Sequence, residues 1–208
     1  AAPPATTQPA ITPAERNKVG ITSWGRTVFS SYGVDGNWEI YTLTPVQGGT
    51  LTANLSRNHA SDTQPRLSPD ASQVVFVSDR DRNVEIYRMQ SDGSAQVRLT
   101  AHPADDTQPF WSPDGGTILF ASKRDGNWNI YRMSPDGSGQ LPLTSDPSSD
   151  IMPSWSPDGG TIAWVRAGAT SGAIWLMNAD GSNPRPITGQ LTYLQHPIWS
   201  PDSTRLAF

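Results

Sequence analysis

Three aspartates that recur at a fixed spacing are the best candidates for binding chemistry in this chain. Asp62, Asp106 and Asp150 lie 44 residues apart, whereas Leu194 holds the fourth position. If the repeated segments surround an axis, the three carboxylates converge near one mouth of a central channel. Such a cluster favours a cation or an inserted Lys or Arg side chain. We therefore predict a metal or basic-partner site there, with local capping of each loop as the alternative.

The histidines and the known catalytic motifs offer little further chemistry. His59 and His102 occupy nearly matching repeat positions, but His196 breaks the register, and all three lie near turn residues. This pattern favours exposed loop histidines over metal ligands. The chain has no Gly-x-Ser-x-Gly elbow, glycine-rich phosphate loop or His-Glu-x-x-His pair. We predict no enzyme activity and no cofactor other than the candidate cation.

A 44-residue repeat supplies the elements that position these side chains. Ser-Pro-Asp occurs at residues 68–70, 112–114, 156–158 and 200–202. A fixed period of this length with strand-like content is typical of propellers and solenoids. The cleanest copy predicts strands at 108–111, 117–122, 128–133 and 140–144, divided by turns rich in Pro, Asp and Gly. A turn-stabilising hydrogen bond accounts for the aspartate of each Ser-Pro-Asp.

Side-chain alternation predicts sheets that are buried on both faces. In residues 128–133, Trp128 and Ile130 point to one face, whereas Tyr131 and Met133 point to the other. A sheet between two others is the environment of a propeller blade. A β-sandwich would show polar residues on one face, and solenoid coils are usually shorter. We predict an all-β propeller of four-stranded blades, with about four to five blades present.

Composition and aromatic spacing narrow the function classes. The chain has 208 residues and a net charge of −4, so it lacks the positive charge that nucleic-acid binding requires. It has no cysteine, which excludes disulfide bonds and thiolate metal sites. No apolar run approaches the length of a membrane span. Trp111, Trp155 and Trp199 share one repeat position, and Trp38 and Trp128 share another, which favours packing between blades over a carbohydrate-binding platform.

The repeat resembles a known family. Trp-Ser-Pro-Asp-Gly-Gly-Thr-Ile at 111–118 and 155–162, Arg-Asp-Gly-Asn-Trp-Asn-Ile-Tyr-Arg-Met at 124–133 and Leu-Thr at 143–144 look like the TolB-type propeller repeat, which is related in style to WD repeats. The resemblance covers residues 26–208. It implies an extracytoplasmic, non-catalytic propeller, usually six-bladed, that binds other proteins. Similar blades also precede the catalytic domain of prolyl-oligopeptidase-like hydrolases.

The two ends of the array are predicted to be incomplete. The first copy supplies strands at 26–31, 38–43 and 50–55 only, and the last copy stops after two strands. Three explanations remain open: a piece of a larger, six-bladed ring, completion by another molecule, or imperfect closure on itself. Residues 1–18, rich in Pro, Ala and Thr, are predicted to form an extended arm or linker, and 19–208 the propeller repeats.

These observations lead to one main functional hypothesis and two alternatives. We expect an exported propeller, periplasmic or extracellular, that acts through contacts with a protein partner. Its N-terminal segment resembles the spacer that follows a cleaved signal peptide. The first alternative is a self-assembling subunit of a surface filament, joined through residues 1–18 and the incomplete last blade. The second is the propeller portion of a larger hydrolase.

Overall fold

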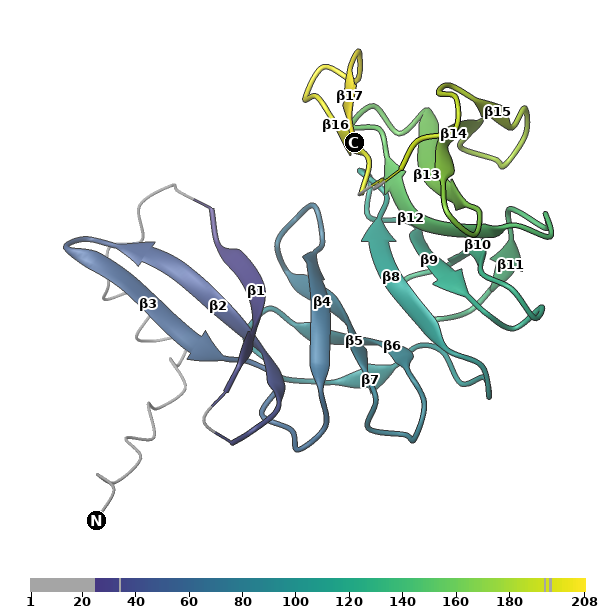
Figure 1. Cartoon of the computed structure of the whole chain (residues 1–208). Helices are drawn as coiled ribbons and strands as arrows, with labels where there is room; N and C mark the ends of the chain where they lie inside the picture. Colours follow the sequence, from purple (N-terminus) through teal and green to yellow (C-terminus); the bar gives the residue numbers. More distant parts are fainter. Residues whose placement is uncertain (1–24, 34, 193, 195) are drawn as a thin grey trace.

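The described part of the chain is built from antiparallel β-sheets. A computed structural model describes residues 25–33, 35–192, 194 and 196–208, and these residues form five sheets and no helix. The sheets are β1–β3, β4–β7, β8–β11, β12–β15 and β16–β17 in chain order (Figure 1). This arrangement confirms the predicted all-β fold with four-stranded blades.

The strand boundaries follow the repeat. The strands are β1 (Thr27–Tyr32), β2 (Trp38–Val46), β3 (Gly49–Asn54), β4 (Asp62–Leu67), β5 (Gln73–Ser78), β6 (Glu85–Gln90), β7 (Val97–Arg98), β8 (Asp106–Trp111), β9 (Ile118–Ser122), β10 (Asn129–Met133), β11 (Leu141–Pro142), β12 (Ser149–Trp155), β13 (Thr161–Ala167), β14 (Gly172–Asn178), β15 (Arg185–Pro186), β16 (Ile198–Trp199) and β17 (Leu206–Ala207). The fourth strands of the three complete blades, β7, β11 and β15, have two residues each and are shorter than predicted.

The Ser-Pro-Asp turns join the first strand of each blade to the second. In the third sheet, Ser112 Oγ donates to Asp114 Oδ1 at 2.5 Å, and the Gly116 N–H donates to the same oxygen at 2.9 Å. The Asp70, Asp158 and Asp202 carboxylates make matching bonds in their own turns. These carboxylates therefore hold the turns closed, as the sequence predicted.

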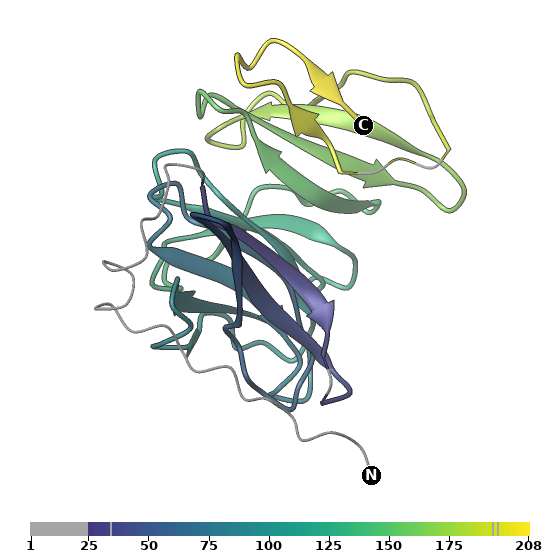
Figure 2. The same cartoon turned by 90° about the vertical axis from the view of Figure 1, so that its left-hand side faces the viewer.

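Each complete inner sheet is buried on both faces. Phe120, Tyr131 and Met133 of the third sheet pack with side chains of the second sheet. Ile130 of the third sheet instead packs with Trp155 and Trp164 of the fourth. The sheets consequently follow one another along an arc, and the view turned by 90° shows the fourth and fifth sheets side by side (Figure 2).

Neighbouring blades approach closely at a glycine of the turn between the third and fourth strands. A Cβ on Gly137 would lie 2.6 Å from the carbonyl oxygen of Leu99 in the preceding blade, and one on Gly93 would lie 2.5 Å from that of Leu55. Both glycines also have a positive φ, 87° and 88°. The repeat therefore requires glycine here for two independent reasons.

The described strands form an open arc. The first sheet has three strands and the last has two, and the described strands of these two sheets do not contact each other (Figure 1). The described strands therefore do not close into a ring. The predicted extended arm, residues 1–18, lies outside the described residues, as do residues 19–24 at the start of the predicted propeller segment.

Candidate functional site

The antiparallel strands give the blades two distinct ends. The turns between first and second strands and between third and fourth strands lie at one end, which we call the turn face; in the second and third blades it comprises residues 68–72, 91–96, 112–117 and 134–140. The other end, the linker face, comprises the loops 79–84 and 123–128 and the inter-blade connection 99–105. Loops displayed by a rigid scaffold are the usual location of binding residues.

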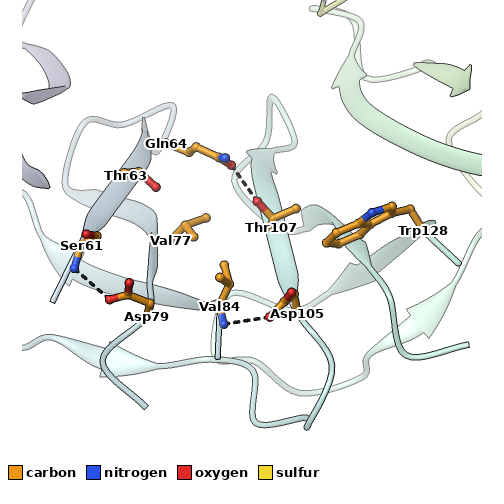
Figure 3. A pocket seen from close by; sticks show the side chains of 9 residues that line it. All are labelled: Ser61, Thr63, Gln64, Val77, Asp79, Val84, Asp105, Thr107 and Trp128. Atoms are coloured by element: carbon orange, nitrogen blue, oxygen red, sulfur yellow. Dashed lines mark hydrogen bonds between the residues drawn. The ribbon is translucent and has the colours of Figure 1, made fainter. Parts of the chain in front are cut away.

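A pocket opens on the linker face between the second and third blades. Its volume is about 340 Å³, which lies within the usual range for ligand sites of about 300–1,000 Å³. Val77 and Val84 supply apolar surface, and Trp128 supplies an aromatic wall (Figure 3). The remaining lining residues are polar: Ser61, Thr63, Gln64, Asp79, Asp105 and Thr107.

The two carboxylates of this pocket are held in place by backbone groups. Asp79 Oδ1 accepts a 2.8 Å hydrogen bond from the Ser61 N–H, and Asp105 Oδ1 accepts one of 3.1 Å from the Val84 N–H (Figure 3). Neither carboxylate forms an ion pair within the described part of the chain. The pocket therefore combines negative charge with apolar and aromatic surface.

The pocket depends on residues that differ between the repeats. One repeat later, Asp79 is replaced by Lys123, and Trp128 is replaced by Gly172. Ser149 stands at the position of Asp105, so the next blade boundary lacks both carboxylates and the aromatic wall. Asp79 and Asp105 are not among the predicted site residues, because the repeat indicates positions that stay constant and these two positions change. A comparison of the positions that change would have indicated them.

A chain of side-chain hydrogen bonds joins the innermost strands. Gln64 Oε1 accepts bonds from Thr107 Oγ1 at 3.0 Å and from the Gln108 N–H at 2.8 Å. Gln108 Oε1 in turn accepts a 2.7 Å bond from the Met152 N–H. Gln64, Gln108 and Met152 have φ between 53° and 57°. Each lies where the pairing register shifts, in β4, β8 and β12 respectively. These bulges let the first strand of one blade clasp that of the next.

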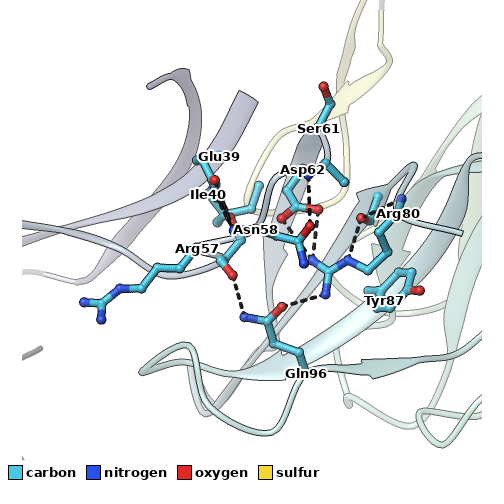
Figure 4. Close-up of polar contacts among 12 residues, drawn as sticks. Glu39, Ile40, Arg57, Asn58, Ser61, Asp62, Arg80, Tyr87 and Gln96 are labelled. Atoms are coloured by element: carbon cyan, nitrogen blue, oxygen red, sulfur yellow. Dashed lines mark hydrogen bonds and ion pairs between the residues drawn. The ribbon is translucent and has the colours of Figure 1, made fainter. Parts of the chain in front are cut away.

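The three predicted site aspartates are fully buried, and each is paired with an arginine of its own blade. Asp62 receives bonds of 3.0 Å from Arg80 at both carboxylate oxygens (Figure 4). Arg124 contacts Asp106 at 2.8 Å, and Arg166 contacts Asp150 at 2.7 Å. The inserted basic side chain that the sequence analysis considered is therefore supplied, in this structure, from within the chain.

Each of these arginines also stacks on two aromatic rings. The Arg124 guanidinium carbon lies 5.5 Å from the centre of the Phe120 ring and 4.7 Å from that of Tyr131. Arg80 and Arg166 repeat this arrangement on Phe76 with Tyr87 and on Trp164 with Trp175. The Asp–Arg–aromatic unit thus fixes the second and third strands to the start of the first.

Burial dominates the electrostatics of two of these aspartates. Desolvation raises the pKa of Asp106, and hydrogen bonding from Ser122 and the charge of Arg124 oppose that rise. The pKa of Asp62 is raised for the same reason and is opposed by Ser78 and Arg80. No group of three or more His, Cys, Asp or Glu side chains within the described residues is arranged to hold a metal ion. The cation site stays a prediction.

The other candidate residues occupy separate places. His59 is exposed, and His102 Nδ1 accepts a 3.1 Å bond from the Ala104 N–H. His196 lines a cavity of about 150 Å³ beside Arg66, and desolvation together with that cation lowers its pKa. Trp111 and Trp155 are buried, as predicted for packing. Trp38, for which packing between blades was also predicted, is instead 44% exposed and contacts Tyr32 of its own sheet.

The sequence of residues 65–208 matches the family model described as the TolB beta propeller domain. The chain belongs to this family. The match begins within β4 and extends to the end of the chain. It contains all four Ser-Pro-Asp turns and the Asp–Arg–aromatic units of the third and fourth blades, whereas Asp62 of the first unit precedes it. The resemblance that the sequence analysis drew from these motifs is therefore confirmed.

Solved structures support the same fold. A protein assigned as a TolB from Agrobacterium tumefaciens is 28% identical, with a TM-score of 0.75, and the match covers 86% of this chain and 67% of that one. TolB from Acinetobacter baumannii is 22% identical, with a TM-score of 0.70 and coverages of 87% and 45%. A puromycin hydrolase is 19% identical, with a TM-score of 0.60 and coverages of 77% and 27%. This chain thus spans about two thirds of the first of these proteins and less than half of each of the other two.

Proposed function

We propose that this TolB-type propeller is a non-catalytic module of an exported protein and that it binds a protein partner through its linker face. The pocket between the second and third blades carries this proposal. It joins a fixed aromatic wall to two carboxylates that have no ion pair among the described residues. Aromatic side chains beside polar groups are typical of the central part of protein interfaces.

The placement outside the cytoplasm rests on the family and on the N-terminal composition. TolB-type propellers are expected to be extracytoplasmic, and residues 1–14 have the Pro, Ala and Thr content of a spacer after a signal peptide. Among the described residues, no helix is long and apolar enough to cross a membrane. Fractionation of the producing cells should therefore recover the protein outside the cytoplasm, and recovery with the cytoplasmic enzymes would contradict the export proposal.

Site-specific photo-crosslinking tests which face binds. A benzophenone amino acid is placed at Arg82 or Lys123 on the linker face, and at Asp136 or Asp180 on the turn face as matched exposed controls. After irradiation in the producing cells, the linker-face variants should give discrete protein adducts, and the turn-face variants should not. Adducts only from the turn face would overturn the assignment of the face. Absence of adducts at all four positions would contradict a protein partner.

Two alternatives remain hypotheses. Self-assembly into a surface filament depends on residues 1–18, which lie outside the described residues. Deletion of these residues should abolish assembly while the blades stay folded, and a sedimentation measurement that shows the same assembly without them would contradict this alternative. The second alternative is that the chain is the propeller portion of a larger hydrolase. The similarity to a puromycin hydrolase, at 19% identity, concerns the fold alone and does not indicate an activity.

A further inference from the structure

We propose that the pocket between the second and third blades binds the ammonium group of a lysine side chain presented by the protein partner. This inference rests on the proposed use of the linker face, and it adds the chemistry of the recognised group. A lysine side chain has a long apolar stem and a compact charged end. The pocket offers matching surfaces to both parts.

The aromatic wall is supported by a backbone hydrogen bond and by packing on one side. The carbonyl oxygen of Trp128 accepts a 2.8 Å hydrogen bond from the Asp150 N–H, and its side chain packs against the apolar cluster shared by the third and fourth blades. Figure 3 shows its indole ring on the same side of the pocket as Asp105 and Thr107. A cation near the face of an indole ring is attracted by the ring quadrupole.

The acceptors for the ammonium group are equally well placed. Asp79 and Asp105 each use Oδ1 to accept a backbone N–H, and Oδ2 of each has no hydrogen-bond partner among the described residues. An ammonium group has three donors and no acceptor. The two carboxylates meet its charge, while Val77 and Val84 line the same pocket and provide apolar contact for the methylene stem.

The repeat supplies an internal control for this site. At the next blade boundary, Lys123 replaces Asp79 and Gly172 replaces Trp128. A second lysine would therefore meet a like charge and no aromatic wall there. The array thus presents this combination once among the second to fourth blades, which gives a partner a single register along a repetitive surface.

The probe for this site is Nα-acetyl-lysine methylamide, with the Nε-acetylated form as a neutral control of the same stem. Binding is followed from the ¹⁵N–¹H signals of the Trp128 indole and of the Val84 and Ser61 amides in the full chain. Trp128→Phe assigns the indole signal. We expect saturable shifts with a dissociation constant on the order of 1 mM, as for a small ligand with few contacts.

Variants identify the groups responsible. Asp79→Asn combined with Asp105→Asn keeps acceptors for the backbone N–H groups and should weaken binding about fivefold. Trp128→Leu should weaken it about threefold. Asp136→Asn, on the turn face, should leave it unchanged. If the double variant unfolds, as judged by its amide spectrum, Asp105→Asn alone should still weaken binding about twofold.

Several results would overturn the inference. These are no saturable shift at about ten times the expected dissociation constant, equal binding of the neutral control, unchanged binding by the carboxylate variants, or tighter binding of the arginine analogue. If the probe fails while photo-crosslinking still marks the linker face, only the assigned chemistry is wrong. If the probe binds while adducts form on the turn face alone, the pocket stands and the proposed function fails.

Discussion

Gly137→Ala should destabilise the protein far more than Gly126→Ala, although both glycines lie in turns of the third blade with a positive φ, 87° and 94°. At Gly126 a Cβ would have no heavy atom within 4 Å, so only the cost of a left-handed backbone applies. That cost is about 1–2 kcal/mol. At Gly137 the Cβ would lie 2.6 Å from the Leu99 carbonyl oxygen and 3.1 Å from its Cα.

The extra cost at Gly137 comes from moving one blade away from another. The atoms that the new Cβ would meet belong to the backbone of Leu99 in the preceding blade, so they cannot move aside as a flexible side chain would. Overpacking of this kind costs about 1–3 kcal/mol more. Urea unfolding of both variants under the same conditions measures the difference, with the slope of each transition checked for a change in cooperativity. Equal losses of stability in the two variants would refute the close approach of the blades.

Three further predictions concern the core, the arginine units and the turns. Phe120→Ala removes a fully buried ring and should cost about 3–5 kcal/mol; a near-neutral urea midpoint would contradict the stacked blades. Asp106→Ala leaves the Arg124 guanidinium without its buried partner and should cost about 3 kcal/mol, whereas unchanged unfolding would show that the ion pair is dispensable. The Ser68 hydroxyl and the Ser72 backbone lower the pKa of Asp70 to about 2, so its stabilising contribution is present above the ordinary value of 3.8 and is lost as pH falls toward 2. Asp70→Asn should therefore flatten the stability profile in that range, and an unchanged profile measured by urea unfolding would exclude this contribution.

The repeated part of the fold could be predicted from local chemistry. The interval between Ser-Pro-Asp turns sets the length of a blade, and the alternation of Ile130 with Tyr131 sets its two buried faces. Both signals repeat, so each copy supports the others. The short fourth strands were less predictable, because a two-residue ladder depends on pairing with its neighbour more than on its own sequence.

The candidate site was predicted only in part. Burial of Asp62, Asp106 and Asp150 against arginines joins residues 16–18 positions apart, and only folded strands bring these positions together. The bulges at Gln64, Gln108 and Met152 carry no sequence mark, because these residues rarely adopt a positive φ. The pocket arises where two blades differ from the repeat, a feature that periodicity conceals.

Hydrogen–deuterium exchange of the chain, free and bound to the partner recovered by photo-crosslinking, is the decisive measurement of where this propeller binds. The proposal predicts slower exchange on binding in residues 79–84, 99–105 and 123–128, and unchanged exchange in the Ser-Pro-Asp turns. Protection confined to residues 68–72 and 112–117, with none around Asp105 and Trp128, would contradict binding through the linker face.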